Sequence, residues 1–161
     1  MTNMRKTRFW VQAAIIAAVY AVLTVAFAPI SYGPIQVRIS EALTILPFFT
    51  PAAVPGLFVG CLTSNLLSPY GALDIVCGSL ASLLAAGGSY ALRGAPALVP
   101  LPPVAANALI IGAMLRFAYG VEPSFWICAL WVGAGEVAAC YVLGYPLMLY
   151  MRRHKDIFRL D

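Results

Sequence analysis

Few side chains in this chain can do chemistry, and five of them lie within or at the edge of strongly apolar segments. They are Arg38, Glu41, Asn65, Asp74 and Glu136. An ionisable group at the centre of a membrane helix costs about 2.5–3.5 kcal/mol on insertion scales, so each one needs a partner or a function. A guanidinium fork and carboxylates together are suited to holding a polar solute through charge-assisted hydrogen bonds.

Arg38 and Glu41 stand three residues apart in "GPIQVRISEALTILPFF", residues 33–49. That spacing puts both side chains on one face of a helix. One interpretation is a local ion pair, with Glu41 also favoured by the helix N-terminus. The other is that both point into a cavity below the preceding loop and offer a donor and an acceptor to a ligand.

Asp74 and Asn65 are expected at the same level as that loop. Asp74 begins a helical pattern, so it is either an N-terminal cap or a ligand contact. Asn65 lies near the end of the previous helix, where its amide either bridges helices or binds solute.

Glu136 lies deep inside an apolar segment, "WVGAGEVAACYVLGYP", about 18 Å from the segment's start by helical rise. A carboxyl group at that depth is protonated, paired or in contact with a ligand. Arg38 or Asn107 is the alternative structural partner. Tyr141 and Trp131, five residues to either side, are candidates for a stacking wall, and Tyr141 joins the predicted ligand set.

Other kinds of chemistry have little support in the sequence. His154 is the only histidine and lies in the basic tail. The four cysteines form no Cys-x-x-Cys pair, and we interpret them as small buried hydrophobic residues. No GxxxxGK[ST] pattern occurs, so ATP would have to be hydrolysed by a partner. We therefore predict no metal, no cofactor and no enzymatic activity.

The elements that position these residues are membrane helices. The chain is 62% hydrophobic and 10% charged, whereas a soluble domain carries about 25% charged residues. Breaks at proline, glycine and charge predict one all-α transmembrane domain over residues 1–161 with six spans, at 9–28, 38–49, 52–67, 74–92, 104–119 and 124–150. The second is too short to span comfortably, so we expect it to be kinked at Pro47, tilted or shielded.

Positive charge predicts the orientation of the bundle. Arginine and lysine concentrate at the two termini and in the loop with Arg93, while the opposite loops hold only Arg38 and Arg116. By the positive-inside rule both termini are cytoplasmic and the loop before Arg38 faces outward. The net charge of +4 follows from this topology, and no nucleic-acid partner is needed to explain it.

Small residues form a stripe on the first helix. This stripe suits close helix contact, either within the bundle or with another membrane protein. Its members are Ala13, Ala14, Ala17, Ala18 and Ala21.

Four stretches carry a family resemblance: "FAPISYGPIQVRISEALTILPFFTPAAVPGLFVGC", "GALDIVCGSLASLLAA", "PLPPVAANALI" and "GEVAACYVLGYPL". With them the chain resembles the S-components of energy-coupling-factor (ECF) vitamin importers, and more narrowly the QueT family of queuosine-precursor transporters. The resemblance implies a multi-pass protein of a prokaryotic plasma membrane that captures its solute outside. It also implies a partner complex of a transmembrane coupling protein and two ATPases, and it makes the alanine stripe a docking surface for the coupling protein.

The implied ligand, a 7-deazaguanine base, presents a ring N–H and an exocyclic amine side by side, which one carboxylate can accept together. Glu136 or Glu41 suits that role, and Arg38 or Asn65 suits the ring carbonyl. An aminomethyl cation favours a further carboxylate such as Glu41 or Asp74.

Other functions are weighed beside this one. Another vitamin cargo such as cobalamin is compatible with the same architecture, because fold does not fix specificity. A self-sufficient gradient-driven carrier is disfavoured because the two halves of the chain show no repeat. A membrane enzyme with Glu41 and Glu136 as acid and base lacks a histidine or nucleophile beside them.

Overall fold

The computed structural model describes residues 3–32 and 37–154, and within them every regular element is helical. The elements are α1 (Asn3–Ala26), α2 (Ala28–Ser31), η1 (Ile39–Phe48), α3 (Ala53–Asn65), α4 (Ala72–Ala91), η2 (Pro96–Leu98), α5 (Leu101–Ala113), η3 (Met114–Ala118), α6 (Phe125–Glu136), η4 (Val137–Gly144) and α7 (Tyr145–Arg153).

Four helical stretches are long and apolar enough to cross a membrane: Met4–Ala26, Ala72–Ala91, Pro96–Ala118 and Phe125–Arg153. Two further apolar helices, Ile39–Phe48 and Ala53–Asn65, are shorter. The expected all-α class is confirmed, and each predicted apolar segment is helical. The count of six spans remains a prediction because two segments fall short of the usual spanning length.

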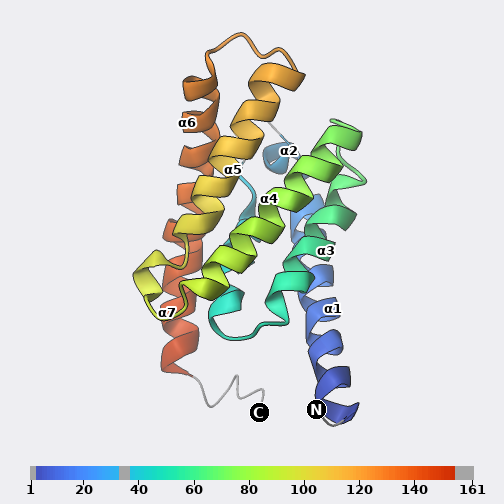
Figure 1. Cartoon of the computed structure of the whole chain (residues 1–161), viewed down its shortest axis with the longest axis vertical. Helices are drawn as coiled ribbons and strands as arrows, with labels where there is room; N and C mark the ends of the chain where they lie inside the picture. The colour runs from blue at the N-terminus through green and yellow to red at the C-terminus, as the bar shows by residue number, and fades with distance from the viewer. Residues whose placement is uncertain (1–2, 33–36, 155–161) are drawn as a thin grey trace.

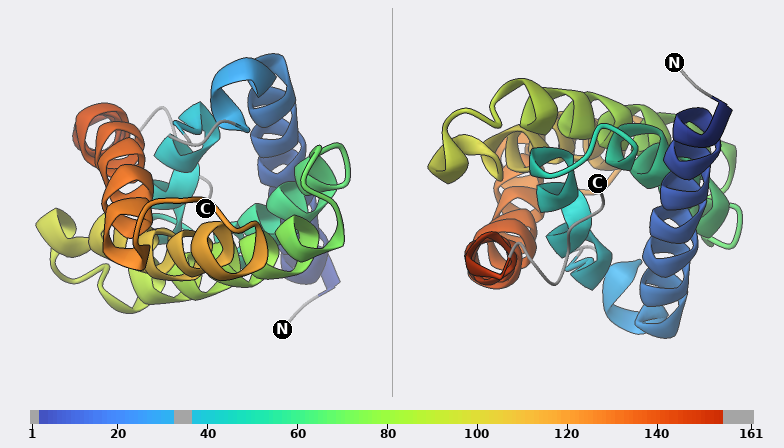
Figure 2. Two further views of the ribbon diagram at one scale, coloured as in Figure 1. Left: turned by 90° about the horizontal axis from the view of Figure 1, so that it is seen from above. Right: turned by 90° about the horizontal axis from the view of Figure 1, so that it is seen from below.

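The helices form a closed ring. Along it α1 packs on α3, α3 on α4, α4 on α5 and α5 on α6 (Figures 1 and 2). The short helix η1 completes the ring, since it packs on both α1 and η4. It also contacts α3, α4 and α7, so it lies close to the centre of the bundle.

The start of α1 and the end of α7 lie at the same end of the bundle, together with the link between α4 and α5 (Figure 1). The turns between α3 and α4 and between α5 and α6 lie at the other end, here called the upper end. This arrangement agrees with the predicted alternation of the chain. That the lower end is cytoplasmic stays a prediction.

The helix η1 is a 3₁₀ helix of ten residues. Runs of this type rarely exceed four residues, and their rise of about 2.0 Å per residue makes η1 about 20 Å long. Three residues per turn place Arg38, Glu41, Thr44 and Pro47 in one row, and all four are buried. The predicted shielding of this short segment is confirmed, and the tighter helix also lengthens it.

The contact between α1 and α3 is very close. A Cβ atom on Gly56 would lie 2.8 Å from the Ala13 carbonyl oxygen, and one on Gly60 would lie 2.9 Å from the Ala17 carbonyl oxygen. Ala13 and Ala17 are buried in this contact. Two members of the alanine stripe therefore pack within the bundle, the alternative that the sequence left open.

Helices α6, η4 and α7 form one continuous helix with a π-helical middle section. A Cβ atom on Gly144 would lie 3.0 Å from the Ala42 carbonyl oxygen, so this glycine lets η4 approach η1 closely. With more than four residues per π turn, Glu136 and Cys140 face the same side, toward η1. Such π segments often occur at functional sites.

Candidate ligand-binding site

A cluster of polar side chains fills the interior of the ring toward its upper end. Its members come from every helix of the ring, and all are at most 5% exposed. They are Tyr20 and Thr24 on α1, Arg38, Ser40, Glu41 and Thr44 at η1, Asn65 on α3, Asp74 on α4, Asn107 on α5 and Glu136 on α6. Five of the six predicted ligand contacts, Arg38, Glu41, Asn65, Asp74 and Glu136, lie in this cluster.

Arg38 is paired across the bundle rather than along its own helix. Its Nη2 atom lies 3.7 Å from Asp74 Oδ1, and its Nε donates to the Ser31 carbonyl oxygen at 3.3 Å. The guanidinium carbon lies 5.7 Å from the centre of the Tyr32 ring. Among the described residues no ion pair other than Arg38–Asp74 forms, so the predicted local pair between Arg38 and Glu41 is not present.

Asp74 is not a helix cap. The N-cap residue of α4 is Gly71, with φ of 74°, and both carboxylate oxygens of Asp74 are buried without a hydrogen-bond partner. Asn65 bridges helices on one side, because its Nδ2 donates to the Asp74 carbonyl oxygen at 3.0 Å. Its Oδ1 is buried and unpartnered, so half of this amide is open to another group.

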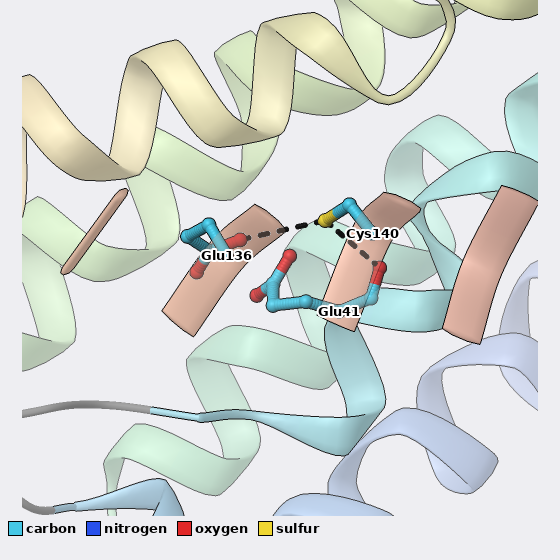
Figure 3. Close-up of side chains that lie close together, drawn as sticks. All are labelled: Glu41, Glu136 and Cys140. Carbon is cyan, nitrogen blue, oxygen red and sulfur yellow. Dashed lines mark hydrogen bonds between the residues drawn. The ribbon is translucent and has the colours of Figure 1, made fainter. Parts of the chain in front are cut away.

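Glu41 and Glu136 face each other on the other side of the cluster (Figure 3). The Tyr20 hydroxyl donates to Glu41 Oε1, whereas Glu41 Oε2 has no partner. The Cys140 thiol lies 3.5 Å from Glu136 Oε2, and the Asn107 amide is beside the same carboxyl group. One carboxylate oxygen of Glu41, one of Glu136 and the sulfur of Cys140 lie within 4.8 Å of one another.

Three tyrosines tie the upper turns together above the cluster. The Tyr119 hydroxyl donates to the Tyr70 carbonyl oxygen at 2.8 Å, and the Tyr70 hydroxyl donates to the Tyr32 carbonyl oxygen at 2.9 Å. The Tyr32 hydroxyl donates to the Ser64 carbonyl oxygen at 2.7 Å. Burial raises the pKa of Tyr32 above its usual range, so its hydroxyl, which is protonated at neutral pH in any case, stays a donor.

The remaining predicted residues lie elsewhere. Tyr141 is half-buried, and its hydroxyl donates to the Ala97 carbonyl oxygen at 3.3 Å, so the structure does not bring it to the cluster. Of the alanine stripe, Ala14 and Ala18 are exposed and Ala21 is half-buried. A docking role for Ala13, Ala14, Ala17, Ala18 and Ala21 stays a prediction.

Sequence reasoning missed Tyr20 and gave Asn107 only a bridging role. Tyr20 and Thr24 continue the line of Ala13 and Ala17 on α1, at spacings of three and four residues. That periodicity was the available signal, because it places both polar side chains on the buried face. No comparable pattern marks Asn107.

The cluster can bind a small polar solute. It offers hydrogen-bond donors on Arg38 and Asn65 and acceptors on three carboxyl groups, within an apolar surround that strengthens each contact. Of the described side chains, six buried atoms have no hydrogen-bond partner: Ser31 Oγ, Arg38 Nη2, Glu41 Oε2, Asn65 Oδ1 and both Asp74 carboxylate oxygens. Buried polar atoms are usually satisfied, so this concentration indicates groups kept for a ligand or water.

Comparison with known proteins identifies the family. Residues 10–153 match the family model described as QueT transporter. The chain belongs to the QueT transporter family. It is also 39% identical over 85 residues to the queuosine precursor transporter QueT of Lactococcus lactis subsp. cremoris (strain MG1363). That match covers half of this chain and half of the relative. No solved structure matches the chain. The family resemblance seen in the sequence is therefore confirmed.

Proposed function

We propose that this QueT family member is the substrate-binding subunit of an importer for a queuosine precursor, a 7-deazaguanine base. The observation that carries the proposal is the buried polar cluster, in which Arg38, Glu41, Asn65 and Asp74 each keep at least one atom without a partner. The name of the L. lactis relative supports the substrate class.

The cluster complements such a base. The ring N–H and exocyclic amine of a 7-deazaguanine are two adjacent donors, which a carboxylate accepts together. Both oxygens of the Asp74 carboxylate are free of hydrogen bonds, and the carboxylate forms an ion pair with Arg38. The ring carbonyl needs a donor, and Arg38 Nη2 is buried next to Asp74 Oδ1 at 3.7 Å without donating a hydrogen bond. Charge-assisted bonds of about 1.5–3 kcal/mol each are enough for tight binding after the cost of ordering the ligand.

The proposal extends to the source of energy. The sequence has no P-loop, and its resemblance to S-components of ECF importers favours transport driven by a membrane coupling protein with two ATPases. In proteoliposomes, we expect this chain alone to bind the base without concentrating it, and uptake to require the coupling subunits and ATP. Accumulation by the chain alone in an ion gradient would instead favour a self-sufficient carrier.

The binding step is tested by calorimetric titration of the purified chain in detergent with 7-aminomethyl-7-deazaguanine, guanine and cobalamin. We expect tight binding of the deazaguanine only. Arg38→Ala should lower its affinity by about a hundredfold, because a charged donor is lost from a buried site.

Arg116→Ala is the matched control. Arg116 bonds the Val121 and Glu122 carbonyl oxygens in the α5–α6 turn, away from the cluster, so its loss should leave affinity unchanged. Thermal unfolding of both variants shows whether each is folded. Unchanged affinity in folded Arg38→Ala protein contradicts the site, and tight binding of cobalamin instead contradicts the substrate.

A further inference from the structure

The buried cluster contains more acid than base. Glu41, Asp74 and Glu136 provide three carboxyl groups, while Arg38 provides the only basic group among the described members of the cluster. Its guanidinium group lies 3.7 Å from Asp74, and no other ion pair forms among the described residues. The base is therefore engaged on the Asp74 side of the cluster, and the Glu41–Glu136 side has no cation of its own.

The glutamate side is arranged to receive a donor. The two carboxyl groups come from η1 and α6 and point toward one another (Figure 3). Glu41 is 1% exposed, and its Oε2 atom is buried without a hydrogen-bond partner. The Oε1 atom of the same carboxyl group accepts from the Tyr20 hydroxyl. The Cys140 thiol is a weak donor and the Asn107 amide is neutral, so neither supplies positive charge.

Burial makes this imbalance costly. A carboxylate removed from water without a counter-charge loses several kcal/mol of solvation that neutral donors recover only in part. A small cation between the two carboxyl groups would form charge-assisted hydrogen bonds to both of them. An ammonium group has three N–H donors, which suits two facing carboxyl groups.

We infer that Glu41 and Glu136, with Cys140 beside them, form a subsite for an organic ammonium group, separate from the Arg38–Asn65–Asp74 side that holds the neutral heterocycle. This inference rests on the proposed function, since it assigns the two ends of one ligand to the two sides of the cluster. It makes the chain selective for a deazaguanine that carries a primary amine over a neutral base of the same shape.

The wild-type protein provides the first test. The probes are 7-aminomethyl-7-deazaguanine and its neutral counterpart 7-hydroxymethyl-7-deazaguanine, which differ in one group of nearly equal size. We expect the amine to bind about tenfold to a hundredfold more tightly at neutral pH, the range that one or two charge-assisted bonds supply.

Variants then locate the selectivity. Glu41→Gln and Glu136→Gln should each reduce the ratio of the two affinities by about tenfold, because they weaken binding of the amine more than binding of the hydroxymethyl ligand. Asp74→Asn is the matched control on the other side of the cluster and should weaken both ligands alike.

The outcomes separate the two proposals. Equal binding of both probes to wild-type protein overturns the ammonium subsite and leaves the proposed function intact. Binding of neither probe to folded protein removes the proposed function as well. Zinc is titrated alone as a competing occupant, and zinc binding that depends on Glu41 and Cys140 while the amine preference survives their loss also overturns the ammonium subsite.

Discussion

Helix α1 takes part in two buried regions of opposite character. Along its lower half, Ala13 and Ala17 pack against Gly56 and Gly60 of α3. One turn higher the same face presents Tyr20, whose hydroxyl reaches into the polar cluster. The first region leaves no room for a methyl group, whereas the second leaves several polar atoms without partners.

This difference shows what each region contributes. Close helix contact through small residues gains dispersion energy and stabilises the bundle without any ligand. Unpartnered buried polar atoms lower stability and are retained where they gain partners on binding. Substitutions that overfill the first region should therefore lower stability more than affinity. Substitutions that remove polar groups from the second region without leaving a buried charge unpaired should lower affinity more than stability.

The largest effect is expected at the Arg38–Asp74 pair. Asp74→Leu alone leaves the guanidinium buried without its partner and should destabilise the protein by about 3–5 kcal/mol. The double variant Arg38→Met/Asp74→Leu replaces the pair by apolar groups, so it should recover most of that stability and still bind ligand over a hundredfold more weakly. Thermal unfolding and calorimetry measure the two quantities. A double variant as unstable as the single one would contradict this reading of the pair.

A smaller effect, confined to stability, is expected at Gly60. The methyl group of Gly60→Ala would lie 2.8 Å from Tyr20 Cβ and 2.9 Å from the Ala17 carbonyl oxygen. Such overpacking costs about 1–3 kcal/mol. Gly87→Ala on α4 is the control, because a Cβ atom there meets nothing within 4 Å. Unfolding temperature should fall only for Gly60→Ala, and affinity measured well below that temperature should fall by less than Arg38→Ala lowers it.

The sequence was sufficient to predict the class and the main elements. Apolar length and punctuation placed the longer helical segments but not the short helices α2 and η2, which lie in predicted connections. Helix α1 also begins at Asn3 rather than at residue 9, because helix continues through polar residues that hydropathy excludes. The 3₁₀ form of η1 was not predictable, since it depends on neighbours that cover the short segment on several sides.

The site residues were predicted mainly from the energetic cost of placing charge in an apolar segment, and less from the spacing of residues along the chain. Arg38, Glu41 and Glu136 were selected because charge in an apolar segment is expensive, and that argument does not depend on knowing the fold. Tyr141 was selected by its distance along the chain from Glu136, but its hydroxyl donates to the Ala97 carbonyl oxygen, which lies outside the cluster. The partner of Arg38 also could not be read from spacing, because Asp74 reaches it from another helix.

A modest effect on binding is expected at Tyr20. Tyr20→Phe removes the hydroxyl that donates to Glu41 while keeping the ring in its packed position. A lost hydrogen bond to a carboxyl group is worth about 1–2 kcal/mol, so ligand affinity should fall by about tenfold. Tyr90→Phe is the control, because its ring stacks on Arg93 near the lower end. Equal affinities for the two variants would separate Glu41 from the ligand.

The smallest effect is expected at Tyr141, and it tests the comparison most directly. Its hydroxyl is bonded to the Ala97 carbonyl oxygen rather than to any member of the cluster, and its ring lies 6.5 Å from that of Tyr145. Tyr141→Phe should therefore lower stability by at most about 1 kcal/mol, the value of one partly exposed hydrogen bond, and leave ligand affinity within about twofold. A loss of affinity as large as that of Tyr20→Phe would mean that the binding region extends along η4 beyond Cys140, and that polar burial alone does not define its limits.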